Sequence, residues 1–155
     1  MLVDGRDLSQ LTATELSRLR CRAIGMAFQN NLCLSALSTW ENAALPLLLE
    51  GRSRSDARSQ AHEWLERVGL IDFACTPTST LSGGQRRRLG LVRAMLGQPK
   101  LLLADEPTAD LDDKTAHDIE QTIFDWLSTN GRAALIVTHE ATLERRATRV
   151  LQLAD

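Results

Sequence analysis

The sequence predicts an α/β fold built on a parallel sheet. Three short apolar runs, at 23–28, 101–104 and 133–138, have the length of buried strands. Segments with helical periodicity lie between these runs, and strands that alternate with helices form βαβ units whose strands run parallel. A continuous apolar run is typical of a strand covered on both faces, so we expect the sheet to be buried.

The first element expected is a helix over 12–20. Thr12 and Glu15 stand at capping-box spacing there, and two leucines share one face of the helix. The strand at 23–28 follows directly. The stretch LSTWENAALPLLLEG, at 37–51, contains both helix-like and turn-like pieces, so its periodicity does not decide its structure.

A mostly helical lobe is expected from about 40 to 96, beside the sheet. Within 55–70 apolar residues recur at helical spacing and Gly69 closes the pattern; these residues are Ala57, Ala61, Trp64, Leu65 and Val68. A further helix is expected from about 84 to 96. Gly97 and Pro99 stop it.

The chain then returns to the sheet. After the strand at 101–104, a helix is expected over about 113–128, because its apolar residues fall on one face. The strand at 133–138 follows this helix. The run TRVLQL predicts a last strand at 148–153.

Length and charge exclude some classes of function. At 155 residues the chain has the length of one domain, and its net charge of −2 argues against non-specific nucleic-acid binding. We therefore expect no nucleic-acid partner. No apolar run approaches the ~20 residues that span a bilayer, so any membrane role requires a partner.

Two adjacent carboxylates follow the apolar run at 101–104. Asp105 and Glu106 would lie at the carboxyl edge of the sheet, where α/β folds bind ligands. An aspartate in this position suits Mg²⁺, held directly or through water. Glu106 could then orient and deprotonate an attacking water.

The stretch LSGGQ, at 81–85, is the second chemical signal. Its glycines let backbone N–H groups approach a phosphate, and the helix N-terminus that follows favours an anion. Ser82 adds a hydroxyl donor. We expect the three arginines at 86–88 to form a solvated helix face, because consecutive positions point in different directions.

Single polar residues follow the other two strands in the same way. Gln29 comes after the run at 23–28, and His139 comes after the run at 133–138, where it could hydrogen-bond a terminal phosphate. Three strands would thus deliver polar groups to one edge of the sheet.

Taken together, these motifs resemble those of the ATP-binding subunit of ABC transporters. LSGGQ matches the signature motif, LLLADE the Walker B motif and ADLD the D-loop at 109–112, while His139 matches the switch histidine and Gln29 the Q-loop. The segments VDGRDLSQLTATELSRLRCRAIGMAFQ and WENAALPLLLEG look like the lipoprotein-releasing and macrolide-export branch. The resemblance covers essentially the whole chain.

The resemblance implies a P-loop NTPase core with a helical lobe, and ATP and Mg²⁺ as cofactors. It implies one partial ATPase domain, with core portions at 1–30 and 97–155 and the lobe at about 31–96. Glu106 and His139 would be catalytic, and Asp105 and Gln29 would hold the metal. The nucleotide-binding residues would be Gln29, Ser82, Gly83, Gly84, Gln85 and Asp110.

The resemblance also implies partners. In the family two ATPase subunits, identical or different, sandwich two ATP molecules head to tail, so each ATP touches the Walker A motif of one subunit and the signature of the other. A transmembrane permease subunit would meet the lobe near 29–50. The chain would then lie on the cytoplasmic face of the membrane, attached through that permease.

The main departure from the family is the phosphate loop. No glycine-rich loop ending in Gly-Lys-Ser or Gly-Lys-Thr occurs in the sequence, and neither Lys100 nor Lys114 follows a glycine. The family's Walker A motif would lie upstream of Met1, so the resemblance predicts an N-terminally truncated ATPase that is inactive alone. The Walker A strand of the family lies between the His139 strand and the last strand, and its loss would separate 148–153 from the sheet.

Two alternatives are open. The chain could be a non-hydrolysing partner that lends LSGGQ to an intact subunit. It could instead be a soluble ABC protein without a transporter, although repair-type relatives insert long coiled coils where this chain has only 30–80, without sustained heptads.

Overall fold

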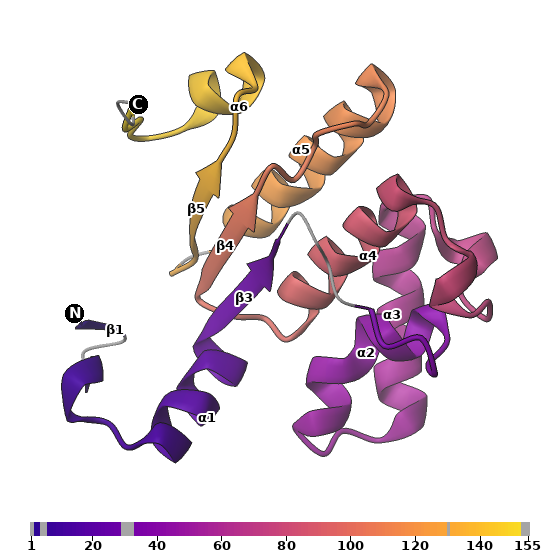
Figure 1. Ribbon diagram of the computed structural model, residues 1–155, viewed down its shortest axis with the longest axis horizontal. Coiled ribbons are helices and arrows are strands. Elements are labelled where there is room, and N and C mark those ends of the chain that lie inside the picture. Colours follow the sequence, from indigo (N-terminus) through magenta and orange to yellow (C-terminus); the bar gives the residue numbers. More distant parts are fainter. Residues whose placement is uncertain (1, 4–5, 29–32, 130, 153–155) are drawn as a thin grey trace.

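The computed structural model describes residues 2–3, 6–28, 33–129 and 131–152 (Figure 1). The chain begins with a short antiparallel ribbon, β1 (Leu2–Val3) and β2 (Arg6–Asp7), and a 3₁₀ turn, η1 (Leu8–Gln10). Helix α1 (Ala13–Ala23) follows and is longer than the sequence predicts. Its start is the predicted capping box, because Glu15 Oε2 accepts from Thr12 N at 2.9 Å and Thr12 Oγ1 accepts from Glu15 N at 3.3 Å.

The described sheet contains β3 (Ile24–Ala27), β4 (Leu101–Asp105) and β5 (Ala133–Val137) in the order β3-β4-β5. All three run parallel, as predicted. In the register, Ile24 pairs with Leu101 and Leu101 with Ala133, while Asp105 at the far end pairs with Val137. The carboxyl ends of the strands therefore lie at one edge of the sheet.

The sequence predicts a helical lobe in the segment between β3 and β4. This segment contains α2 (Thr39–Leu49), α3 (Arg54–Arg67), the 3₁₀ turns η2 (Ile71–Phe73) and η3 (Thr78–Thr80), and α4 (Gly83–Leu96). Figure 1 shows α2, α3 and α4 grouped on one side of the strands. Beyond β4 come α5 (Asp113–Leu127), which lies alongside that strand, and the short α6 (Ala141–Arg146) after β5.

Helix α2 resolves the stretch whose periodicity was ambiguous. Its first turn is a capping box between Ser38 and Glu41, and Pro46 lies inside the helix. The fully buried Asn42 closes the loop before it, since its Oδ1 accepts from Leu34 N at 2.8 Å and its Nδ2 donates to Leu34 O at 3.0 Å. Hydrogen bonds from Ser38, through its hydroxyl and its backbone N–H, lower the pKa of the Glu41 carboxyl.

The core lies between α4 and its neighbours α2, α3, α5 and the sheet. Leu89, Val92 and Met95 of α4 are fully buried, and so are Leu65 of α3 and Ile123 of α5. On the sheet side, Gly25 lets β3 approach α4 directly. A Cβ atom at this residue would lie 2.0 Å from the backbone oxygen of Ala94.

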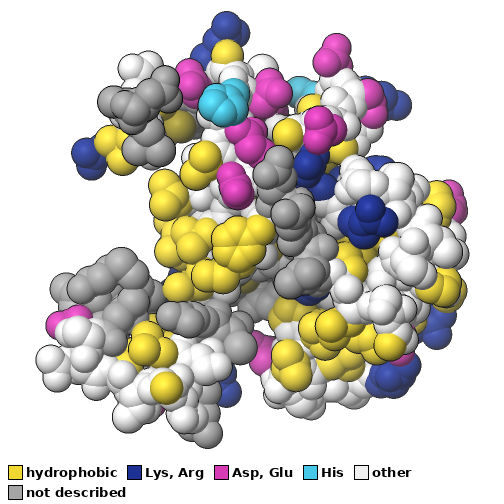
Figure 2. Space-filling view, in the orientation of Figure 1, with side chains coloured by type: hydrophobic (Ala, Val, Ile, Leu, Met, Phe, Trp, Pro, Cys, Tyr) yellow, Lys and Arg dark blue, Asp and Glu magenta, His cyan; other side chains and the backbone are white. Residues whose placement is uncertain are grey.

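The prediction that the sheet is buried on both faces is wrong for the described residues. Alternate residues of β5 stay open to solvent, with Leu135 59% and Val137 50% exposed, and Met26 of β3 is 39% exposed on the same face. Helix α4 packs against the opposite face, where Gly25 meets Ala94, and no described element buries Leu135 or Val137. Figure 2 shows hydrophobic side chains gathered over the strands there.

The predicted strand at 148–153 is also absent from its described part. Residues 148–152 form no strand, and Val150 and Leu151 are 48% and 65% exposed. An apolar run becomes a strand only beside another strand that takes up its hydrogen bonds, and no described strand pairs with this segment. In the described part of the chain, no helix combines the length and the apolar character needed to cross a bilayer.

Candidate active site

The carboxyl edge of the sheet brings Glu106 and His139 together, as their positions after β4 and β5 predict. Glu106 N donates to Val137 O at 2.9 Å, which extends the pairing of the two strands by one residue. His139 Nε2 lies 3.5 Å from Glu106 Oε1. The imidazole is 98% exposed while the carboxylate is 17% exposed, so the carboxylate is sheltered and the imidazole faces solvent.

Glu106 is held in an unusual backbone conformation. Its φ angle is +47°, in the left-handed region that residues with a side chain seldom adopt. Thr138 Oγ1 donates to Glu106 Oε2 at 3.4 Å, so the two carboxylate oxygens have different neighbours. Thr138 and His139 thus hold the Glu106 carboxylate from two sides. This arrangement suits a carboxylate that accepts a proton from a nearby water.

Asp105 ends β4 beside Glu106 and is half-buried. Among the described residues, no three His, Cys, Asp or Glu side chains group as a metal site. Mg²⁺ at nucleotide sites commonly needs only one or two carboxylates, the rest of its shell being phosphate oxygens and waters, so one half-buried aspartate fits such an ion. Gln29, the other predicted metal ligand, lies outside the described residues.

The signature stretch forms a capped helix start. Ser82 is the N-cap of α4, its Oγ accepts from Gln85 N at 3.2 Å, and Gln85 Oε1 accepts from Ser82 N at 2.8 Å. Ser82 and Gly83 are exposed. Since the Ser82 oxygen accepts from the helix, its own O–H remains a donor for an anion that binds at the helix N-terminus.

The two glycines of this turn have different surroundings. A Cβ atom at Gly83 would meet nothing within 4 Å, so this glycine leaves open space before the helix. At Gly84 a Cβ atom would lie 3.1 Å from Leu111 Cδ2. The absence of a side chain at Gly84 therefore allows the start of α4 to lie close to the 109–112 segment.

The prediction that the arginines at 86–88 form a solvated face is wrong for two of them. Arg88 is half-buried and donates from Nη1 to Val68 O at 2.7 Å, which ties α4 to the end of α3. Arg87 is half-buried and reaches Ala109 O and the Asp110 carboxylate. Both guanidinium groups point inward because they donate to backbone carbonyls, one in the lobe and one in the 109–112 segment. The spacing of the arginines in the sequence does not indicate these acceptors.

Asp110 is positioned on the surface by this arrangement. Its side chain is 84% exposed and its φ angle is +58°. Two residues further along the chain, Asp112 caps α5, and hydrogen bonds from the Thr115 side chain and backbone hold the pKa of this carboxyl below its usual value. The segment 109–112 thus joins the strand edge to the start of α5.

A family model described as "ABC transporter" matches residues 1–109. The chain belongs to the ABC transporter family. Its fold agrees with solved members, since it superimposes on the ATP-binding cassette MJ0796 in a dimeric, post-hydrolysis state bound to ADP and Pi. That likeness has a TM-score of 0.85 and 33% identity, and it covers 92% of this chain and 63% of MJ0796.

ABC relatives with curated names are ATP-binding proteins. A methionine import ATP-binding protein of Rhizobium johnstonii is 44% identical over 145 residues, which are 94% of this chain and 40% of the relative. A lipoprotein-releasing system ATP-binding protein of Caulobacter vibrioides is 38% identical over 153 residues, 99% of this chain and 67% of the relative. A macrolide export ATP-binding/permease protein of Rhodopseudomonas palustris is 39% identical, over 99% of this chain and 23% of the relative. The predicted branch is among these relatives, and the chain spans only part of each.

Proposed function

We propose that this chain is part of the ATP-binding and ATP-hydrolysing subunit of an ABC-type membrane transporter, which works as a dimer of cassettes. The observation that carries the proposal is the meeting of Glu106 and His139, at 3.5 Å, at the carboxyl edge of a parallel sheet. The family match and the relatives, which are named as ATP-binding proteins of import, export and release systems, support it.

The proposed chemistry assigns one task to each residue. Glu106 accepts a proton from the attacking water, and its contacts with Val137 O and Thr138 Oγ1 fix its orientation. His139 is exposed beside it and donates a hydrogen bond to the terminal phosphate. Asp105 would hold Mg²⁺, which neutralises charge on the phosphates when bound.

The signature turn would serve a second nucleotide. Ser82 and Gly83 are exposed at the N-terminus of α4, where a hydroxyl and backbone N–H groups favour phosphate. These 155 residues contain no Gly-Lys-Ser or Gly-Lys-Thr loop. We therefore propose that a phosphate loop outside these residues binds the triphosphate, and that it belongs either to the same protein or to another subunit. On this proposal the chain supplies the water-activating residues and the signature donors.

Replacing Ser82 with Arg tests this assignment. The larger cation fills the space at the start of the helix and removes the hydroxyl donor, so ATP hydrolysis by the transporter assembly should fall about a hundredfold. The measurement is phosphate release by the assembly purified from native membranes through a tag on this chain. Ser79→Arg, the same change at an exposed residue of η3, is the matched control and should keep the wild-type rate. Equal rates for Ser82→Arg and wild type would remove the signature turn from the mechanism.

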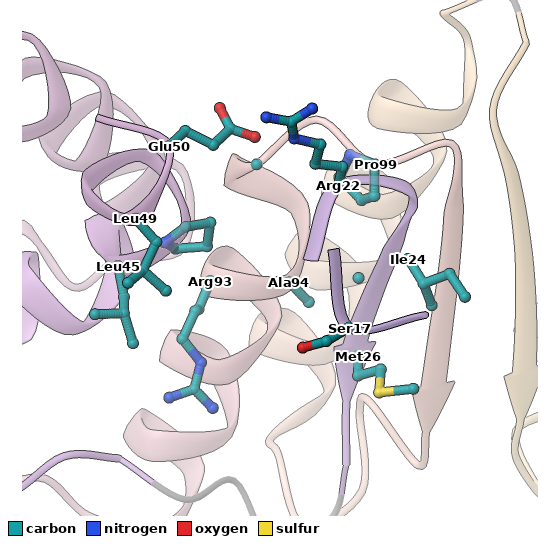
Figure 3. A pocket seen from close by; sticks show the side chains of 13 residues that line it. Ser17, Arg22, Ile24, Met26, Leu45, Leu49, Glu50, Arg93, Ala94 and Pro99 are labelled. Carbon is teal, nitrogen blue, oxygen red and sulfur yellow. The ribbon is translucent and has the colours of Figure 1, made fainter. Parts of the chain in front are cut away.

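A pocket of about 520 Å³ beside the lobe is the proposed docking site for the permease. Leu45 and Leu49 of α2 and Ile24 and Met26 of β3 are among the residues that line it. Figure 3 shows Leu45 and Leu49 on one side, with Arg93 of α4 projecting between α2 and β3. Its rim carries charge, because Arg22 and Glu50 point toward each other there. Apolar side chains together with the charged groups of Arg22, Glu50 and Arg93 suit an amphipathic helix that projects from a membrane subunit.

A charge introduced at this pocket should detach the chain from membranes. Leu49→Asp puts a carboxylate on a side chain that is 73% exposed, so the fold tolerates it, while a docked apolar helix would have to bury it. The share of the tagged chain that sediments with native membranes should fall at least about tenfold. Ile71→Asp, in η2 and outside the pocket, is the control and should sediment like wild type. A Leu49→Asp chain that stays with the membranes would place the permease elsewhere.

A further inference from the structure

Arg87 connects two segments that are far apart in the sequence and carry different parts of the proposed site. It lies in the second turn of α4, the helix that the signature turn begins. Its guanidinium donates to the backbone oxygen of Ala109, and Nη1 and Nη2 lie 3.3 and 3.2 Å from Asp110 Oδ2. One side chain thus binds both a main-chain and a side-chain acceptor of the 109–112 segment.

This contact differs from an ordinary surface ion pair. The Asp110 side chain is 84% exposed, and an exposed pair of this kind contributes little by itself. The Arg87 side chain, in contrast, is only 12% exposed, and its bond to Ala109 O is a charge-assisted bond to the backbone. Arg87 therefore acts mainly by holding the backbone of 109–112 in position.

The contact continues to Glu106 through one residue, Ala109. Ala109 N donates to Glu106 O at 3.3 Å, while the carbonyl oxygen of Ala109 accepts from Arg87. Glu106 and Asp110, at the two ends of this turn, both have positive φ angles, +47° and +58°. Backbone of this kind keeps its conformation only where its surroundings hold it, and Arg87 is part of those surroundings.

A second contact joins the same two segments. Leu111 packs beside Gly84, where a Cβ atom would lie 3.1 Å from Leu111 Cδ2. The first and second turns of α4 are therefore both attached to the turn that starts at Glu106. A shift of the signature turn would be transmitted along these contacts to the carboxylate.

We propose that Arg87 is a positioning residue that couples the signature turn, which serves the partner's nucleotide, to Glu106, which serves this chain's own nucleotide. The proposal rests on the proposed function for the identity of the two sites. It adds a connection between them within one chain, made by a residue that touches neither nucleotide.

The first test measures the connection without catalysis. In Arg87→Gln, the amides of Ala109 and Leu111, which donate to Glu106 O and Thr108 O, should exchange with deuterium about tenfold faster than in wild type. Asp110→Asn keeps the bond to Ala109 and should change this exchange about twofold at most. Arg145→Gln, on α6, removes the same charge at an exposed position and is the control. Unchanged exchange in Arg87→Gln would overturn the proposal.

The second test separates positioning from stability. In the tagged transporter assembly, Arg87→Gln should lower kcat about tenfold while KM for ATP stays within about twofold, because Arg87 binds protein backbone. Arg87→Lys, which can still donate one bond to Ala109, should recover part of that kcat. Faster exchange with an unchanged kcat, or a KM that rises alone, would overturn the positioning role. A wild-type assembly without ATP hydrolysis would instead refute the proposed function, and the exchange experiment would still decide the connection.

Discussion

Replacing Glu106 with Gln is expected to lower ATP hydrolysis by the assembled transporter at least about a hundredfold. The amide keeps the size of the side chain and can still accept hydrogen bonds, but it cannot take a proton from water. Glu106 is sheltered, at 17% exposed, and lies 3.5 Å from His139. The rate is measured as phosphate release at saturating ATP, with ATP binding measured separately.

Glu144→Gln is the matched control, because it makes the same change on the exposed surface of α6. Its rate should equal that of wild type. A Glu106→Gln assembly that hydrolyses ATP at the wild-type rate would contradict the hydrolytic role. If Ser82→Arg abolished hydrolysis in the same experiments, that result would identify the chain as a non-hydrolysing donor of its signature turn.

Replacing Gly25 with Ala is expected to cost at least about 3 kcal/mol of the free energy of unfolding. The added Cβ atom would lie 2.0 Å from Ala94 O and 2.9 Å from Pro99 Cγ. The first of these atoms belongs to the backbone of α4, so β3 and α4 would have to separate to make room. Urea unfolding, followed by the far-UV signal, measures the change.

Gly83→Ala serves as the control for that measurement. A Cβ atom there meets nothing within 4 Å, and Ala is a better helix former than Gly, so stability should not fall. An unfolding midpoint for Gly25→Ala equal to that of wild type would show that β3 and α4 are packed less closely than the structure describes.

The sequence predicted most helices and strands because their signals are local. Helical periodicity placed α3, α4 and α5, and three apolar runs placed the parallel strands. The carboxyl ends of parallel strands meet at one edge, so the positions of Glu106 and His139 after β4 and β5 were enough to predict their proximity. Thr138 was missed as a partner of Glu106, although it directly precedes His139.

Burial and side-chain direction were decided by the tertiary structure. The apolar run of β5 does not show that one face of the strand is open, since exposure depends on what packs against it from elsewhere. Helical periodicity likewise could not predict that the Arg87 and Arg88 side chains point inward. Their acceptors, Ala109 O and Val68 O, are about twenty residues away in the chain. The sequence alone determined which groups the site contains and the order in which the strands present them. Only the folded structure, which supplies the distant carbonyl groups and the packing of α4, decided how the signature turn and Glu106 are joined.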